Sequence, residues 1–384
     1  MALAAAALAS IGPLSLTLVG PALPAIALSY SVGEDAVAPA MTLYLAGFAG
    51  GQLVCGPLSD RYGRRPITLA FLGLYLLGTV LAVLAPTPGL LTTARLLQGL
   101  GASVGLTMGR AMVRDQFQGQ AAARILSLVG MTVSVAPALA PVIGGAILAT
   151  QSWRWLFVMM GVYSLALAAF ALFRLRETAA GGDGPARRLS IGHILSTYGM
   201  LITSRAFLGP TLTSAFGIGG VYTFVTVAPF VLGHEVGLQP AIIGQVLALP
   251  AASYFLGAIV TNRLLARVDA GRMVTWGLGM LLVAGSAALA LLSFWPPIVP
   301  TVIGPAMLWA FGMSMVMPGS STGALAPFPQ SAGAASALMG CIQMVTGTIG
   351  GLVATTLLGD VVLGLATVPL ALALGALVSR RLDR

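Results

Sequence analysis

The segment GPLSDRYGRRP, residues 56–66, is a short charged stretch between two long apolar ones, residues 38–58 and 66–86. The whole chain of 384 residues repeats this alternation, because 58% of its residues are hydrophobic and only 8% are charged. Soluble domains carry about 25% charged residues, so this composition excludes a soluble enzyme. An apolar stretch of about 20 residues can cross a bilayer as a helix. The sequence therefore predicts a membrane protein built from helices.

Twelve apolar segments can be distinguished, each bounded by charged or turn-forming residues. They cover residues 4–29, 38–58, 66–86, 90–112, 123–149, 154–173, 206–232, 239–261, 273–295, 298–318, 329–358 and 361–379. Between the sixth and the seventh lies a Gly-rich charged stretch, residues 174–205, which contains RLRETAAGGDGPARR. We therefore expect an all-α membrane protein with two six-helix bundles, residues 1–175 and 205–384, joined by a cytoplasmic linker, residues 176–204.

The arginines indicate how the chain is oriented. All 19 basic residues are arginines, and 17 of them lie in alternate connections or at the C-terminus, with Arg95 and Arg154 elsewhere. Such residues concentrate in cytoplasmic loops, so we expect a multi-pass protein of the plasma membrane, the inner membrane in a bacterium, with both termini cytoplasmic. Scattered arginines do not form the basic face with interleaved aromatic residues that nucleic-acid binding requires, so no nucleic-acid partner is expected.

The two halves also carry a degraded internal repeat. Asp60-Arg61, after the second apolar segment, aligns with Asn262-Arg263, after the eighth, at an offset of 202 residues. Repeats of six spans are typical of transporters whose halves are related by a pseudo-two-fold axis along the membrane normal, with a substrate cavity between them.

Segment 56–66 contains residue types that suit a conformational contact at a membrane surface. Gly56 would let two helices approach closely, Gly63 would permit a tight turn, and Asp60 could accept hydrogen bonds from arginines or from the N-terminus of a neighbouring helix. The alternative is that the arginines only determine topology.

The same segment resembles motif A of the major facilitator superfamily. The matching residues are Gly56, Leu58, Asp60, Arg61, Gly63, Arg64 and Arg65. The resemblance implies that the Asp60 carboxylate meets the start of span 11, that Asp115 completes a charge relay with Arg64, and that these residues act as a cytoplasmic latch.

A charged side chain lies inside the fourth predicted span. An arginine within a bilayer is costly unless it faces a polar interior, so Arg95 is a candidate for coupling or cargo binding. The alternative is an arginine that extends to the lipid headgroups. The stretch ARLLQGLG, with Arg95 and Gln98, resembles the second motif of the superfamily, which favours the functional interpretation.

The fifth predicted span reads VAPALAPVIGGAI and resembles the superfamily's antiporter motif. Pro137, Pro141, Gly144 and Gly145 lie in it, where small residues permit close packing and prolines bend the helix. Together with RPITL, MVRD and FPQSAGAASAL, this stretch makes the chain similar to the Bcr/CflA branch of drug:proton antiporters. That resemblance implies a multidrug efflux transporter with no cofactor other than the proton gradient.

One position departs from that branch. In the stretch LTLVGPALP, residues 16–24, Thr17 stands where members of the branch commonly have an aspartate, and no predicted span contains Asp or Glu. Without a buried carboxylate to neutralise a cation, Arg95 favours neutral, zwitterionic or anionic cargo. The proton carrier stays unidentified, with Asp115, His234 and Glu235 at span ends as the nearest candidates.

The residues expected to line the cavity are polar, aromatic or flexible residues of the spans. They are Thr17, Tyr222, Phe224, Gln245, Tyr254, Trp309, Gln343 and Met344. Residues of these types in a span more often serve in packing than in ligand contact, so packing is the alternative for each. The function expected is proton-driven export of small amphipathic drugs by a monomer in the lipid bilayer, and no metal site or enzyme activity is expected. A carrier of sugars or amino acids with the same fold, and a receptor that does not transport, are the alternatives.

Overall fold

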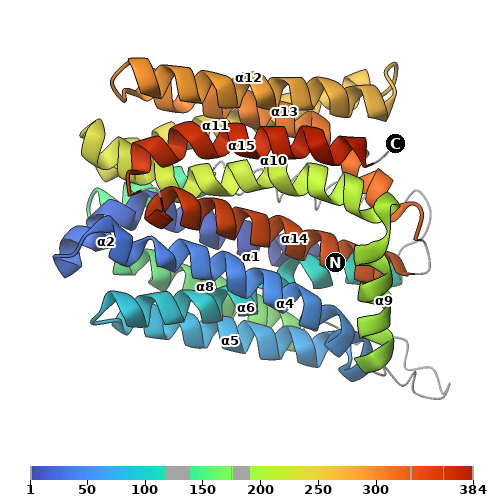
Figure 1. Cartoon of the computed structure of the whole chain (residues 1–384). Helices are drawn as coiled ribbons and strands as arrows, with labels where there is room; N and C mark the ends of the chain where they lie inside the picture. Colours follow the sequence, from blue (N-terminus) through green and yellow to red (C-terminus); the bar gives the residue numbers. More distant parts are fainter. Residues whose placement is uncertain are drawn as a thin grey trace.

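A computed structural model of the chain describes residues 2–116, 139–173, 175, 191–328, 331–357 and 359–382. These residues are almost entirely helical, and no strand occurs among them. The long helices run side by side along one common direction, as Figure 1 shows. The prediction of an all-α membrane protein is confirmed.

The helices of the first half are α1 (Ala2–Val19), α2 (Leu23–Tyr30), α3 (Glu34–Val37), α4 (Pro39–Tyr62), α5 (Arg64–Leu84), α6 (Pro88–Gln116), the helix Leu139–Leu148 and α8 (Arg154–Phe173). Those that follow are α9 (Ile191–Thr203), α10 (Arg205–Phe230), α11 (Pro240–Leu264), α12 (Ala270–Phe294), α13 (Val299–Leu325), α14 (Ala332–Leu352) and α15 (Val361–Arg381).

Ten helical segments within the described residues are long and apolar enough to cross a membrane. Helix α6 is not among them, because Arg95 and Gln98 in its interior lower its hydropathy, although its 29 residues exceed the length that a bilayer requires. The shorter apolar helix Leu139–Leu148 lies within the fifth predicted segment. These twelve helical regions therefore follow the order of the twelve predicted spans, although most of the fifth predicted segment, 123–149, precedes Leu139 and lies outside the described residues.

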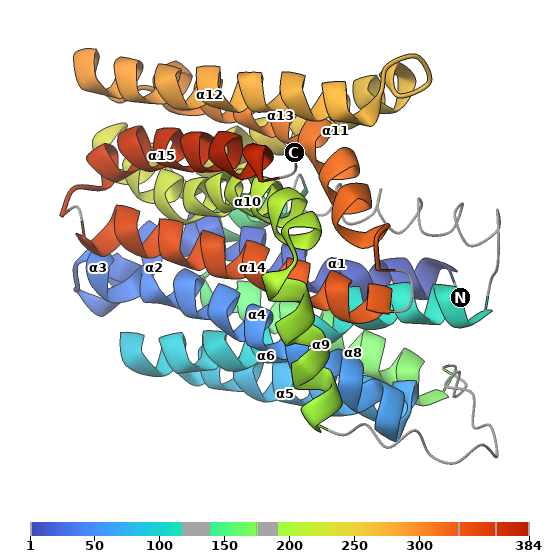
Figure 2. The same cartoon turned by 45° about the vertical axis from the view of Figure 1, so that its right-hand side comes forward.

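Two large hydrophobic clusters form the core. The first is drawn mainly from α1 to α8 and the second from α10 to α15. Three buried residues of the second half, Phe230, Cys341 and Met344, belong to the first cluster. They mark where the halves meet, and Figures 1 and 2 show α14 beside α4 along this boundary.

Three of the helices at this boundary lose regular α-geometry near one end. Helix α1 passes through a 3-10 turn, Gly20–Ala22, because Pro21 and Pro24 lack the N–H groups that an α-helix needs there. Helices α10 and α14 each end in a π-helical turn, Val231–Glu235 and Val353–Leu357. Such turns occur frequently at functional sites in helical proteins.

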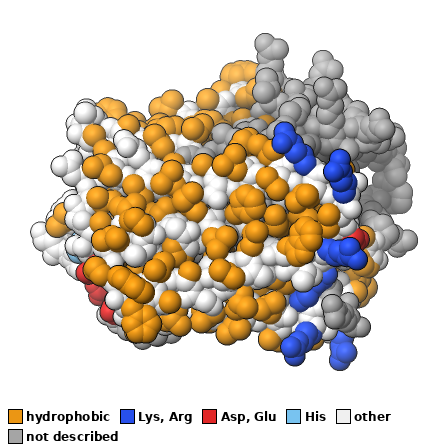
Figure 3. Space-filling view, turned by 90° about the horizontal axis from the view of Figure 1, so that it is seen from above, with side chains coloured by type: hydrophobic (Ala, Val, Ile, Leu, Met, Phe, Trp, Pro, Cys, Tyr) orange, Lys and Arg blue, Asp and Glu red, His pale blue; other side chains and the backbone are white. Residues whose placement is uncertain are grey.

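Charged side chains gather at opposite ends of the bundle (Figure 3). We call the end with Arg205, Arg263, Arg267, Arg272, Arg380 and Arg381 the arginine end, and the end with Asp35, Glu235 and Asp360 the acidic end. Helix α1 begins and α15 ends at the arginine end (Figure 1). Asp360 caps α15 at the acidic end by accepting from the backbone N–H groups of Val362 and Leu363.

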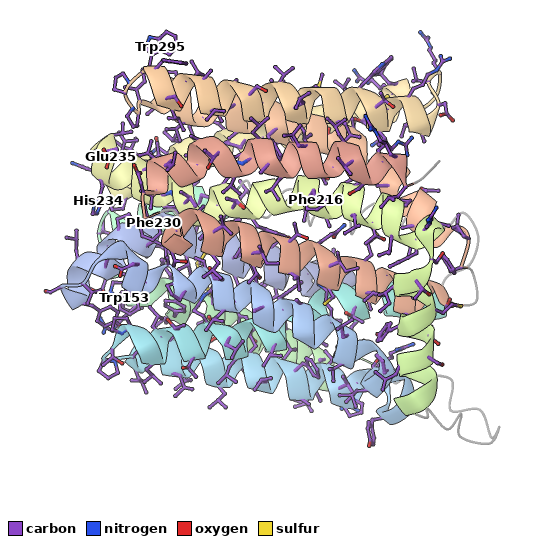
Figure 4. All side chains as sticks on the ribbon, in the orientation of Figure 1. Trp153, Phe216, Phe230, His234, Glu235 and Trp295 are labelled. Carbon is purple, nitrogen blue, oxygen red and sulfur yellow. The ribbon has the colours of Figure 1, made fainter. Side chains whose placement is uncertain are left out.

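Arg154, one of the two arginines outside the topology pattern, lies at the acidic end. Its Nε and Nη2 atoms donate to the carbonyls of Val83 and Ala85 at 3.1 and 3.0 Å, at the end of α5. Its guanidinium carbon lies 4.3 Å from the centre of the Trp153 ring. Figure 4 shows Trp153 at the same end as His234, Glu235 and Trp295. Arg154 therefore caps α5, because the last carbonyls of a helix attract a cation.

The segment predicted to be only a linker contains a helix. Helix α9 lies across the ends of the spans rather than parallel to them (Figures 1 and 2). Residues 191–203 are mostly apolar, and they form a helix because this apolar surface can pack against α10 and α14. The charged residues 176–190 of the predicted linker lie outside the described part of the chain.

Candidate functional site

Arg95 of α6 is fully buried inside the first half. Its Nη1 donates to Gln98 Oε1 at 3.0 Å and its Nη2 to the Ser15 carbonyl oxygen at 3.2 Å. The Met41 sulfur lies 3.8 Å from Nη2, and the guanidinium carbon lies 4.0 Å from the centre of the Tyr44 ring. An arginine that extended to the headgroups would keep its guanidinium near water, so this burial contradicts that alternative.

A second layer of polar groups connects the Arg95 site to four helices. Gln98 Nε2 donates to Thr79 Oγ1 at 2.8 Å, which fixes the orientation of the Gln98 amide whose oxygen accepts the hydrogen bond from Arg95. The Ser15 and Tyr75 hydroxyls are hydrogen bonded at 2.5 Å, and the Tyr44 hydroxyl donates to the Gly12 carbonyl at 2.9 Å. Helices α1, α4, α5 and α6 therefore share one network around the guanidinium.

The Arg95 charge is surrounded by neutral groups. The partners that the described residues supply are carbonyl, amide, thioether and aromatic groups, and Arg95 Nε is buried with no hydrogen-bond partner among them. A buried charge without a counter-charge is costly. The site therefore has unused capacity to attract an electron-rich or anionic group.

The second half holds a neutral counterpart of Arg95. Trp309 of α13 donates its indole Nε1 hydrogen to the Gly217 carbonyl of α10 at 2.9 Å. Gly217 aligns with Ser15 at the same 202-residue offset that aligns Asp60 with Asn262. Corresponding carbonyls in the middle of α1 and α10 thus accept from Arg95 in one half and from Trp309 in the other. The buried charge of the network is confined to the first half.

Trp309, one of the residues predicted to line the cavity, is buried in the second half. Its ring packs so closely against Gly220 of α10 that a Cβ on this glycine could not be accommodated. The physical reason is the hydrogen bond to Gly217, which directs the indole into the interior of the second half.

The other predicted cavity residues do not converge on one site. Tyr222 and Met344 pack with the cluster of the first half, whereas Phe224 and Tyr254 pack with that of the second. Gln343 is buried and donates to Ser214 Oγ at 3.1 Å, and buried Thr17 donates to the Pro13 carbonyl at 2.9 Å. Gln245 is exposed on α11. Of the set, Tyr222 and Met344 lie at the boundary between the halves.

The structure adds boundary and network residues that the sequence patterns did not single out. Gln52 of α4 is buried with its side-chain oxygen against Gly340 of α14. Ser15, Tyr44 and Thr79 complete the Arg95 network. A polar residue at each of these positions within an apolar span was the available signal, but many such residues only bond to their own helix.

The residues predicted to form an antiporter motif make close backbone contacts at the acidic end. A Cβ on Gly144 would lie 2.6 Å from the Leu18 carbonyl of α1, and one on Gly145 would lie 2.9 Å from the Ala241 carbonyl of α11. From the other side, Gly244 of α11 lies directly against the Pro141 carbonyl. The helix Leu139–Leu148 therefore meets α1 and α11 backbone to backbone, while Pro137 lies outside the described residues.

Segment 56–66 forms a turn between α4 and α5. Gly63 has φ 98°, a conformation that favours glycine, and its N–H donates to the Ser59 carbonyl at 3.1 Å. Arg64 is buried and its Nη1 donates to Ser59 Oγ at 2.6 Å, while Arg65 Nη2 donates to the Leu172 carbonyl at the end of α8 at 2.5 Å. The side chains of Asp60, Arg61 and Asp115, and with them the predicted relay, lie outside the described ones.

Gly56 does not have the packing role that was predicted for it. A Cβ there would lie 3.8 Å from Thr107 Cγ2, an ordinary van der Waals contact. The close approach of α4 to α6 occurs instead at Gly51, where a Cβ would lie 2.7 Å from the Leu100 carbonyl.

Comparisons with known proteins agree with this geometry. A family model described as Major Facilitator Superfamily matches residues 5–351. The chain is 31% identical over 346 residues to the protein of Bacillus subtilis (strain 168) named Uncharacterized MFS-type transporter YdgK, which covers 89% of this chain and 85% of that protein. It is 30% identical over 344 residues to Multidrug resistance protein D of Escherichia coli (strain K12), with 88% and 84% covered.

Solved structures show the same fold. A bacterial homolog of the human lysosomal transporter Spinster, in an inward-facing and unoccupied conformation, superposes with a TM-score of 0.75 at 16% identity, covering 100% of this chain and 95% of that one. The human organic anion transporter MFSD10 superposes with a TM-score of 0.66 at 16% identity, covering 100% and 98%.

Proposed function

Because the chain belongs to the Major Facilitator Superfamily, a class of membrane transporters and not of enzymes, we propose that it exports small drug-like compounds in exchange for protons. Similarity to Multidrug resistance protein D over 88% of the chain supports the drug-efflux part of this proposal. The observation that carries it is the Arg95 site, a fully buried cation that the described side chains surround with neutral groups alone.

The proposed cargo is neutral or zwitterionic. A lipophilic cation needs a carboxylate or an equivalent counter-charge when it leaves water, and the predicted spans contain no Asp or Glu. Arg95 adds a positive potential that repels cations further. Neutral phenicol-like or bicyclomycin-like compounds, with several carbonyl and hydroxyl groups, could use the unpartnered Nε of Arg95.

The proposed mechanism is alternating access by two bundles, residues 1–175 and 205–384. The close contact of the helix Leu139–Leu148 with α1 and α11 would close the acidic end, and would separate when the bundles rock. Its Pro and Gly residues, with VAPALAPVIGGAI as a whole, support assignment to the Bcr/CflA branch.

At the arginine end, segment 56–66 would serve as the latch. Arg64 is held by Ser59 beside the Gly63 turn, at the level of the last turn of α4, which contains Asp60. We place this end in the cytoplasm, together with both termini, because arginines concentrate on that side of a membrane protein. Proton entry then contributes about 2.3 kcal/mol per charge for each 100 mV.

Drug accumulation in bacterial cells that lack other efflux pumps tests the proposal. Expression of the chain should lower the accumulation of a phenicol-like compound, whereas ethidium should accumulate as in empty-vector cells. Asp60→Asn and Arg95→Ala should each restore accumulation at equal membrane expression, and Arg263→Ala, at an exposed position of the arginine end, should not. Strong ethidium efflux, or normal efflux by both variants, would contradict the proposal.

A further inference from the structure

Helix α9 connects the two halves at the arginine end. It lies across the spans in both views of the fold (Figures 1 and 2) and packs against α10 and α14. Its Tyr198 hydroxyl donates to the Leu53 carbonyl of α4 at 3.3 Å. Since α4 belongs to the first half and α14 to the second, α9 bridges the pair of helices that meet at Gln52 and Gly340.

The inner face of α9 has a small core of its own. Leu201 is buried with Phe207 of α10 and Met339 of α14, and Tyr198 packs against this group. Burial raises the pKa of Tyr198 to about 12, so its hydroxyl keeps the proton that it donates to Leu53 at neutral pH. The helix is thus fixed to the bundle along one side.

The outer face of α9 is amphipathic. Leu195 and Ile202 are 63% and 50% exposed, and they are seven residues apart, which places them on one stripe of the helix. Thr203, which is exposed too, lies about a quarter turn away from Ile202, and with Ser196 it forms a polar stripe that separates Leu195 and Ile202 from exposed Met200. The helix contains no Asp, Glu, Lys or Arg.

The position and charge of α9 indicate which surface covers the apolar stripe. The helix lies where the membrane-crossing segments end, which is the level of the lipid headgroups. Exposed Arg205 follows it directly, and further exposed arginines, Arg263, Arg267 and Arg272, lie at the same end. Arginines at this level attract anionic lipids, and helices with one apolar and one polar stripe lie in the interface plane.

We propose that α9 is a membrane-surface helix, with Leu195 and Ile202 in the acyl-chain boundary and Arg205 on the phosphates of anionic lipids. Through Tyr198 and Leu201, the lipid-bound helix α9 holds the arginine ends of α4 and α14 together. The lipid composition of the inner leaflet thereby influences the contact between the two halves, independently of which cargo the transporter carries.

Adjacent cysteines provide a matched test in proteoliposomes. Ile202→Cys and Thr203→Cys are introduced one at a time after Cys55 and Cys341 are replaced by alanine, and each is labelled with bimane. Lipids brominated on their acyl chains should quench the label at position 202 at least threefold more than at 203, and aqueous iodide should show the reverse order. Equal quenching at both positions, or iodide quenching at 202, would overturn the proposal.

The lipid charge is tested by the rate at which a neutral, membrane-impermeant maleimide modifies Ile202→Cys. The attraction of one arginine to an anionic surface changes the fraction of molecules in which residue 202 is exposed to water by about fivefold. Labelling should therefore be about fivefold slower in phosphatidylglycerol than in phosphatidylcholine vesicles. Arg205→Gln should remove this difference. Equal labelling rates in both lipids would refute the contact with anionic lipids. Protection of residue 202 from the maleimide that rises with the protein-to-lipid ratio would also refute it, because a second copy of the chain would then cover this face.

Discussion

Gly244 offers a direct way to weaken closure at the acidic end. In the structure this glycine of α11 lies against the Pro141 carbonyl, and a Cβ on it would also lie 3.0 Å from the Gly145 Cα. Both neighbours are backbone atoms, so no side chain can rotate away from the added methyl group. Gly244→Ala therefore destabilises the state in which α11 touches the helix Leu139–Leu148, and leaves a state in which they are apart unchanged.

The size of this effect follows from packing energetics. Forcing a methyl group into a packed contact costs about 1–3 kcal/mol. A difference of this size changes the ratio of two states by about 5- to 150-fold. The population that is open at the acidic end should rise by that factor.

A buried cysteine reports the change. Ala22 is buried in the 3-10 turn that contacts α10 and α11, so Ala22→Cys, with the native cysteines replaced by alanine, should react slowly with a membrane-impermeant maleimide. Gly244→Ala should accelerate labelling at least fivefold. The matched control is Gly279→Ala in α12, where nothing lies within 4 Å of the added Cβ and the rate should not change. If Gly244→Ala labels at the unaltered rate while its thermal stability is also unaltered, the reasoning from this contact is wrong.

Three further predictions concern the Arg95 site, its counterpart and the turn. Arg95→Lys keeps the charge but loses the planar group that stacks on an aromatic ring and donates hydrogen bonds from two nitrogens. Drug transport should therefore fall at least tenfold at equal expression. Unchanged transport would mean that charge alone is sufficient. Trp309→Phe removes the hydrogen bond to Gly217 and should lower the free energy of unfolding by about 1 kcal/mol, measured as a lower melting temperature in detergent. An unchanged melting temperature would show that the hydrogen bond does not stabilise the fold. Gly63→Ala places a side chain at φ 98° and should cost about 1–3 kcal/mol, whereas Gly73→Ala, in open space, should be neutral; equal melting temperatures for the two would remove the argument for a strained turn.

The helical segments could be predicted from the sequence because apolar length alone distinguishes a span from a loop. The predicted segment 154–173 coincides with α8, and the segment at 361–379 differs from α15 by two residues. The Gly63 turn was also accessible, because charged residues and a glycine between two apolar segments leave few alternatives. Helix α9 was not predicted, because the short apolar stretch 191–203 was grouped with the charged, Gly-rich residues before it as one linker.

The arrangement of the site could be predicted only in part. The position of Arg95 within a span left both burial and extension to the headgroups open, and the motif resemblance favoured burial. Its partners Ser15, Tyr44 and Thr79 come from three other helices, and no local pattern indicates which helix faces which. Trp309 was predicted to line the cavity because of its residue type, and its hydrogen bond to the Gly217 carbonyl was not predicted. The 202-residue offset would have paired Ser15 with Gly217, although it could not have shown that Arg95 and Trp309 donate to them.

The central claim is that the chain moves neutral cargo in exchange for protons without a carboxylate in its spans. Purified protein in proteoliposomes with an imposed pH gradient tests it most directly, with the uptake of a radiolabelled phenicol-like compound and of ethidium measured in parallel. The account predicts that the neutral compound accumulates against its concentration gradient, that accumulation stops when the pH gradient is dissipated, and that ethidium does not accumulate. Gradient-driven accumulation of ethidium, or uptake of the neutral compound that is unaffected by the pH gradient, would contradict it.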